Sequence, residues 1–230
     1  RKNDFEGDIQ LHIKGLPKGV TANCGRILAK NKTGAVILSA AANSKPSITN
    51  IKVHGTAKSL LKGQKSVLLR SVNATPCQET YKPGGGRGFW HVKVHTISVA
   101  APQGIRSVKL KQKEIKLTPG GTARVDIEIV RAKGFDKSVQ LDPFFQHLGS
   151  TFGKTLPSGI TVDVKKSKTI LKGKETKGYI VFKANSSVAP FEKQQVSITA
   201  NISINFVMKS TYSSDPLFVT ILKSPPAKKK

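Results

Sequence analysis

The sequence is poor in acidic residues and in the residues that most often carry chemistry. Among 230 residues there are 13 Asp and Glu, two cysteines, one methionine and one tryptophan. No apolar run approaches the roughly 18–20 residues of a membrane-spanning helix, so no transmembrane segment is expected. So few carboxylates disfavour dedicated calcium sites. Because no Cys-x-x-Cys pair occurs, zinc ribbons and thioredoxin-like chemistry are excluded.

Motifs of nucleophilic and metal catalysis are also missing. Neither Gly-x-Ser-x-Gly nor His-Glu-x-x-His occurs. His91 and His95 are predicted on one strand, about 13 Å apart at roughly 3.3 Å per residue, too far to share a zinc ion. The glycine-rich segment 83–88 lacks the Gly-Lys-Ser/Thr ending of a phosphate-binding loop and predicts a flexible connection. We therefore expect no enzyme, no cofactor and no metal site.

Basic residues are abundant and evenly spread. The chain has 39 Lys and Arg and a formal net charge of +26, whereas magnitudes of about 2–8 are usual for a small domain. Residues 1–104 carry 16 basic and 4 acidic residues, and residues 105–230 carry 23 and 9. Most are lysines, while phosphate and base recognition favours arginine. The pattern favours a lysine-coated surface over a specific nucleic-acid site, and anionic partners stay open.

Alternating apolar residues predict an all-β chain. In 123–129, Val125, Ile127 and Ile129 share one face, and 196–204 alternates in the same way. A period of two buries one face of a strand and exposes the other, as in antiparallel sheets. The segment 118–121 (Thr-Pro-Gly-Gly) predicts a tight turn between two such strands.

The sequence also contains an internal repeat. Gly15–Thr21 reappears as Thr155–Thr161, and Lys32–Leu38 matches Thr176–Phe182. Upstream of these segments, Phe5, Ile9 and Leu11 match Phe135, Val139 and Leu141. We therefore predict two domains, residues 1–100 and 105–223, followed by a basic tail, residues 224–230.

The second copy is longer than the first at its start. About 25 residues precede Arg131 and predict two strands, Ser107–Leu117 and Thr122–Val130, whereas Arg1 already matches Arg131. We expect the first domain to lack its two opening strands, which a longer parent chain or a strand from elsewhere would supply. An unfilled position would leave a bare sheet edge and an exposed apolar face.

The repeat unit reads Phe-x3-Ile-x-Leu, Leu-Pro-x-Gly-Val-Thr and Gly-x-Val-Ile-Leu-x-Ala. It resembles the bacterial immunoglobulin-like (Ig-like) repeats of large exported proteins, which occur beside pre-peptidase C-terminal modules or appended to peptidases and glycoside hydrolases. The resemblance implies two tandem antiparallel Ig-like β-sandwiches and a secreted, cell-surface or periplasmic location.

The same resemblance implies a non-catalytic spacer or adhesion module whose partners are neighbouring domains of a longer parent chain. The high charge leaves a module that binds acidic polysaccharide, an anionic envelope polymer or another carbohydrate as an alternative. A further alternative is an accessory part of a secreted peptidase or glycosidase whose catalytic domain lies outside this chain.

Two sets of residues are candidates for special roles. In an exported protein, Cys24 and Cys77 would form a disulfide closing a loop of about 50 residues, and two free buried thiols are the alternative. Aromatic residues beside two loops could contact a ligand, with core packing as the competing interpretation. The candidates are Tyr81, Arg87, Phe89 and Trp90 around the glycine-rich segment, and Phe144 and Phe145 in the insertion of the second copy.

Overall fold

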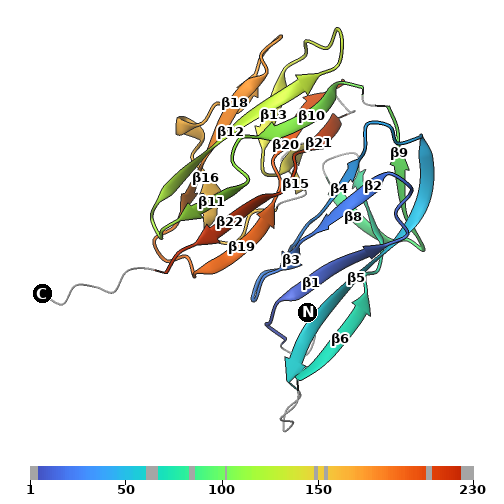
Figure 1. Cartoon of the computed structure of the whole chain (residues 1–230), viewed down its shortest axis with the longest axis vertical. Helices are drawn as coiled ribbons and strands as arrows, with labels where there is room; N and C mark the ends of the chain where they lie inside the picture. Colours follow the sequence, from blue (N-terminus) through green and yellow to red (C-terminus); the bar gives the residue numbers. More distant parts are fainter. Residues whose placement is uncertain are drawn as a thin grey trace, which may run out of the picture. The chain divides into compact units, whose positions relative to one another are not determined.

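The computed structural model describes residues 5–60, 67–82, 86–101, 103–147, 150–152, 155–205 and 209–223. This part of the chain consists of strands and one short 3-10 helix, η1 (Val164–Lys166), which confirms the predicted all-β class (Figure 1). None of its helices is long and apolar enough to cross a membrane. The predicted basic tail lies outside the described residues.

The chain divides into two compact units, which are described separately. Unit 1 covers Arg1–Ala101 and Leu148–Ser150, and unit 2 covers Pro102–His147 and Thr151–Lys230. The first sheet of unit 2 has the order β10 (Ile105–Leu110), β12 (Thr122–Arg131), β18 (Lys177–Ala184), β16 (Ile160–Val162). The second has the order β17 (Ile170–Leu171), β13 (Val139–Asp142), β20 (Thr199–Ser203), β21 (Lys209–Ser213). The third has the order β11 (Glu114–Leu117), β22 (Leu217–Ile221), β19 (Phe191–Val196), and β14 (Phe145–His147) pairs with β15 (Ser150–Phe152).

One hydrophobic core holds unit 2 together. As the alternation predicted, Val125, Ile127 and Ile129 of β12 point inward and are at most 2% exposed. They belong to a cluster of 22 buried hydrophobic residues that come from all three larger sheets. On β12 and β18 every second residue is buried, so the side chains between them face outward.

Two predicted strands are wrong in their extent. The segment Ser107–Leu117 forms two strands, β10 and β11, in different sheets, and β11 runs parallel to β22. The segment 196–204 is likewise interrupted between β19 and β20. There the backbone N–H groups of Ser197 and Ile198 donate to the side chains of Thr155 and Ser214 instead of to a neighbouring strand. In both places the chain leaves one sheet and enters another.

Unit 1 is built around one long strand, β5 (Ser47–Leu60), as Figure 1 shows. Its main sheet has the order β3 (Arg26–Ile27), β1 (Ile9–Lys14), β5, β6 (Val67–Asn73), and β9 (His95–Val99) pairs with the first part of β5. Separate pairs are formed by β2 (Val20–Cys24) with β4 (Val36–Ala40), and by β7 (Cys77–Lys82) with β8 (Gly86–His91).

The strand pairs of unit 1 recur in unit 2, and Ile9, Leu11 and Val20 take part in them at positions that the sequence repeat matches. Val20 faces Ala40 as Ile160 faces Ala184, and Ile9 faces Ile27 as Val139 faces Leu171. Leu11 faces Gly55 as Leu141 faces Ala200. Thr49 faces Ile97 as Gln194 faces Val219. The Leu-Pro-x-Gly element forms the same turn in both units, with φ of 81° at Gly19 and 85° at Gly159. Glycine adopts this left-handed conformation without steric cost.

The two units differ sharply in the number of hydrophobic side chains that they bury. Unit 2 contributes all 22 residues of the core cluster, whereas the described part of unit 1 has three buried hydrophobic residues, Leu28, Ile37 and Ile51. Leu141 is fully buried and its counterpart Leu11 is half-buried. Side chains at equivalent strand positions are therefore less buried in unit 1 than in unit 2.

Candidate functional site

Unit 2 has a groove lined by residues of β10, β12 and β18. Its volume is about 600 Å³. Five cationic side chains line it together with two carboxylates and one tyrosine, and the floor includes Ile127 of the core. The charged and aromatic lining consists of Lys109, Lys111, Arg124, Lys168, Lys177, Asp126, Glu128 and Tyr179.

Strand geometry explains why these side chains meet. The alternation that turns Ile127 inward turns Asp126 and Glu128 outward on the same strand. The register then places Asp126 opposite Tyr179, and Glu128 between Lys109 on one neighbour and Lys177 on the other. Residues far apart in the sequence thus form one polar surface.

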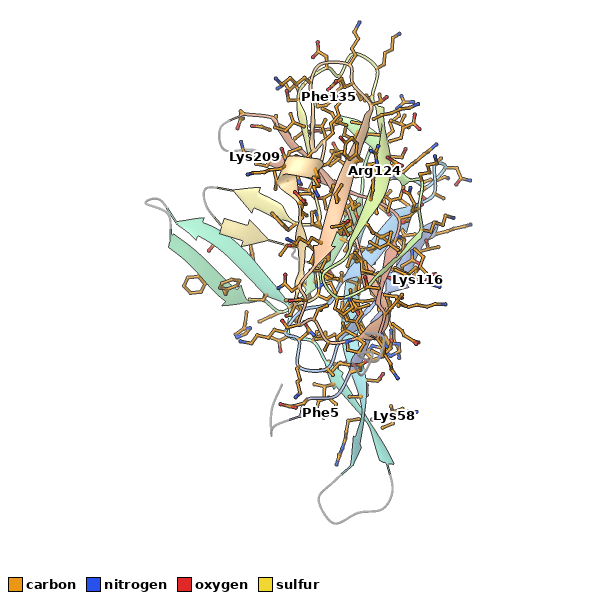
Figure 2. The ribbon with its side chains drawn as sticks, turned by 90° about the vertical axis from the view of Figure 1, so that its left-hand side faces the viewer. Phe5, Lys58, Lys116, Arg124, Phe135 and Lys209 are labelled. Atoms are coloured by element: carbon orange, nitrogen blue, oxygen red, sulfur yellow. The ribbon has the colours of Figure 1, made fainter. Side chains whose placement is uncertain are left out.

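Arg124 contacts both an aromatic ring and a carboxylate of the groove. Its guanidinium lies 3.6 Å from the centroid of the Tyr179 ring, and both Nε and Nη2 lie 2.8 Å from Oδ1 of Asp126. Gln112 also donates to Asp126, at 3.2 Å. These hydrogen bonds, that of Arg124 first, hold the pKa of Asp126 below its usual range. Arg124, labelled in Figure 2, thus lies over the ring of Tyr179 and pairs with Asp126.

The lysines of the groove are less engaged. Lys168 donates to Oε1 of Glu175 at 2.9 Å, which lowers the pKa of that carboxyl group. Within the described part of the chain, no ion pair closer than 4 Å holds Lys109, Lys111 or Lys177. Five cations against two carboxylates give the groove a net positive charge, and ammonium groups bind carboxylates or sulfates through charge-assisted hydrogen bonds.

The predicted ligand residues of unit 1 lie on the β7–β8 hairpin. Tyr81 faces Arg87 across it, and the side chains of these two residues lie outside the described part. Phe89 is 64% and Trp90 57% exposed, so the core-packing interpretation is wrong for both. Nε1 of Trp90 donates to Oγ1 of Thr80 at 2.9 Å. As neighbours on one strand, Phe89 and Trp90 point to opposite faces, and their role in ligand binding stays a prediction.

The other predicted pair lies in unit 2, away from the groove lining. Phe144 is half-buried, and its carbonyl accepts hydrogen bonds of 3.4 Å from the side chains of Thr199 and Asn201. Phe145 begins β14, and its side chain lies outside the described part. These contacts show that Phe144 helps to anchor the insertion to β20.

The expectations for cysteine and histidine need correction. Cys24 and Cys77 are free thiols, so the predicted disulfide is not formed, and Cys77 is exposed instead of buried. His91 ends β8 and His95 begins β9, so they do not share a strand. The residues that the structure describes contain no cluster of three or more side chains suited to a metal ion.

A stacked histidine pair was not foreseen from the sequence. His12 and His54 face each other across β1 and β5, with ring centroids 4.8 Å apart. Nε2 of His12 lies 2.8 Å from Oγ1 of Thr56. Desolvation, with the nearby charges of His12 and Lys14, lowers the pKa of His54. Only the register of two strands 42 residues apart brings the rings together, so no local pattern signals the pair.

Neither protein-family models nor curated proteins match the chain. The alternation of β12 is enough to place Arg124, Asp126 and Glu128 together on the strand face opposite the core. The lysines that complete the groove come from other strands. Their proximity follows from long-range pairing alone.

Proposed function

We propose that the chain is a non-catalytic structural module of an exported or cell-surface bacterial protein, made of two Ig-like β-sandwiches. It would space or attach neighbouring domains of a longer parent chain. The observation that carries this proposal is the recurrence of the same strand pairs, in the same register, in both units. A duplicated strand framework is what a repeat-built spacer requires.

The strand order of unit 2 supports the Ig-like assignment. In a constant-type Ig domain, the first, second, fifth and fourth strands form one sheet, and the third, sixth and seventh form the other. The order β10-β12-β18-β16 follows the first rule if β10 and β11 together count as the first strand. The order β13-β20-β21 follows the second if β19 with β20 is the sixth strand and β21 with β22 the seventh.

Localisation of the parent protein tests the proposal. An antibody raised against the chain is applied to intact cells, with the culture medium assayed in parallel and a cytosolic enzyme as the control for lysis. We expect labelling of intact cells, or recovery from the periplasm or medium, and loss of surface labelling after protease treatment. Recovery of the chain only with the cytosolic marker would contradict export.

The basic groove favours a second function, binding of an acidic polysaccharide or another anionic polymer. Three lysines of the groove, Lys109, Lys111 and Lys177, form no ion pair with the described residues, and they line it together with an arginine that lies over a tyrosine ring, which suits a negatively charged polymer. A uniform lysine coat would bind the same polymers without any preferred face. The experiment must therefore separate the groove from the coat.

Heparin chromatography with two charge-matched variants makes this separation. One variant replaces Lys109, Lys111 and Lys177 by glutamine, and the control replaces the exposed lysines Lys18, Lys32 and Lys45 of unit 1. A bound polymer releases roughly one counterion per lysine contact, so the log–log salt slope of binding should fall by about 2–3 in the groove variant. The control should retain most of the wild-type slope.

Two results would contradict binding in the groove. Equal losses in both variants would indicate a non-specific coat. Failure of the wild-type chain to bind heparin at about 50 mM salt would exclude the polyanion function altogether, because electrostatic binding is strongest at low salt.

A further inference from the structure

Unit 1 has a sheet edge that is covered in unit 2. In unit 2, β18 pairs with β16 on one side and with β12 on the other. Its counterpart in unit 1, β4, pairs with β2, the counterpart of β16, and no described strand lies on its other side. The place taken by β12 in unit 2 is thus not taken by any described segment of unit 1.

A second edge shows the same difference. In unit 2, β22 pairs with β19 and also, in parallel, with β11. In unit 1, β9 pairs with the first part of β5, which corresponds to β19, and no described strand takes the place of β11. Both missing neighbours belong to one continuous segment in unit 2, Ile105–Arg131.

Burial at equivalent positions follows the presence of that segment. Ile180, Phe182 and Ala184 on β18 are completely buried. Their counterparts on β4 are half-buried at Val36, 36% exposed at Leu38 and exposed at Ala40. The face of β4 that carries Val36, Leu38 and Ala40 therefore retains its apolar residues but is less covered than the equivalent face of β18, whereas Ile37 on its other face is buried.

The segment Ile105–Arg131 supplies a large share of the core that it joins. Seven of the 22 buried hydrophobic residues of unit 2 come from it: Ile105, Val108, Ile115, Leu117, Val125, Ile127 and Ile129. Unit 1 has no described equivalent of these seven, and its described part has only three buried hydrophobic residues. The missing segment therefore accounts for a part, but not all, of the difference in burial between the two units.

A glycine supports the equivalence of the two edges. Gly178 lies opposite Ile127, and a Cβ atom there would come within 2.6 Å of the carbonyl oxygen of Lys168. Gly34 is its sequence counterpart, and a Cβ atom there would come within 2.7 Å of the carbonyl oxygen of Arg26. In both units a backbone carbonyl thus lies close to the equivalent glycine, although the two carbonyls come from different positions of the repeat.

We infer that unit 1 binds an extended polypeptide segment of the same kind as Ile105–Arg131 along β4 and β9. The segment runs antiparallel to β4 and parallel to β9, and its alternate apolar side chains complete the core of unit 1. By the register of unit 2, its counterparts of Ala123 and Val125 lie opposite Leu38 and Val36. A polypeptide strand is the occupant because only it supplies both backbone hydrogen bonds and alternating apolar side chains.

This inference goes beyond the proposed function, because it depends on neither export nor the groove. It is tested on the complete, unaltered chain with a synthetic peptide of residues 105–131. Amide hydrogen exchange is measured for β4 and β9, and β13 and β20 of unit 2 serve as internal controls. The control peptide carries Val125→Asp and Ile127→Asp, which remove its apolar face.

We expect the peptide to slow exchange at least tenfold in β4 and β9 and to leave β13 and β20 unchanged. Absence of protection at the highest concentration at which the peptide is soluble would overturn the inference. Equal protection by the control peptide, or changes confined to unit 2, would overturn it as well, because they would indicate non-specific association or strand exchange.

Disulfide trapping tests the register. In a Cys24→Ser, Cys77→Ser background, Leu38→Cys is mixed with a peptide that carries Ala123→Cys and is allowed to oxidise. We expect a cross-link here and at least tenfold less with a peptide that carries Arg124→Cys, because adjacent strand residues point to opposite faces. Equal cross-linking by both peptides would refute the proposed register.

Discussion

Replacing Leu141 by alanine should destabilise unit 2 more than replacing Leu11 destabilises unit 1. The two leucines occupy equivalent strand positions, opposite Ala200 and Gly55 respectively. Leu141 is fully buried within the core cluster, whereas Leu11 is half-buried. The comparison therefore holds residue type and strand position constant and varies only the amount of cover.

The magnitude follows from burial. Alanine lacks three carbon groups of leucine, worth about 2.4 kcal/mol at roughly 0.8 kcal/mol each when fully buried. The cavity left at Leu141 raises the total to as much as about 5 kcal/mol. Leu11 is only partly exposed, so its replacement loses a smaller part of the transfer free energy, about 1.5–2 kcal/mol, and the more open site adds less of a cavity term.

Urea unfolding followed by hydrogen-exchange mass spectrometry separates the two units, because each peptide reports on its own unit. The midpoint for unit 2 should fall strongly in Leu141→Ala, and the midpoint for unit 1 should fall less in Leu11→Ala. Equal losses of unfolding free energy in the two variants would refute the view that unit 1 lacks cover on its core face.

Three further predictions concern single residues. Gly120 and Gly159 both have a left-handed φ, but only Gly159 has close neighbours. Gly120→Ala should lower the unfolding free energy by about 1–2 kcal/mol, and Gly159→Ala should lower it by more. Similar thermal midpoints for the two variants would contradict this. The depressed pKa of Asp126 stabilises the fold above the unfolded pKa near 4, and this contribution is lost as the pH falls through the folded pKa. Thermal unfolding should therefore show Asp126→Asn less stable than wild type at pH 7, with a difference that shrinks as the pH falls below about 4; a difference independent of pH would contradict this. Exposed Cys77 should react with a maleimide faster than Cys24, whose thiol pKa is raised by burial, and mass spectrometry of the labelled peptides would reveal a reversed order.

Local patterns in the sequence were sufficient to predict individual strands and turns. The alternation of Val125, Ile127 and Ile129 identifies β12 and its buried face. The glycines of the two Leu-Pro-x-Gly elements, Gly19 and Gly159, adopt the expected left-handed conformation. These features depend on neighbours within a few residues, which is the range that local sequence controls.

The pairing of strands far apart in the chain could not be predicted from the sequence. The division of Ser107–Leu117 into β10 and β11 follows from the different partners of the two strands, β12 and β22. The groove likewise depends on the register that brings Lys109 and Lys177 to either side of Glu128. Alternation identifies a strand and its two faces, but it does not specify which other strand lies beside it.

The parallel pairing of β11 with β22 gives unit 2 a particular response to tension. These strands lie near the two ends of the unit, so a pull on both ends drives them past each other along their own axes. All hydrogen bonds of the pair then carry the load together in shear, instead of breaking one by one as in an unzipped hairpin. Unit 2 would therefore hold its length under force, whereas β9 of unit 1 has no described parallel neighbour to share the load.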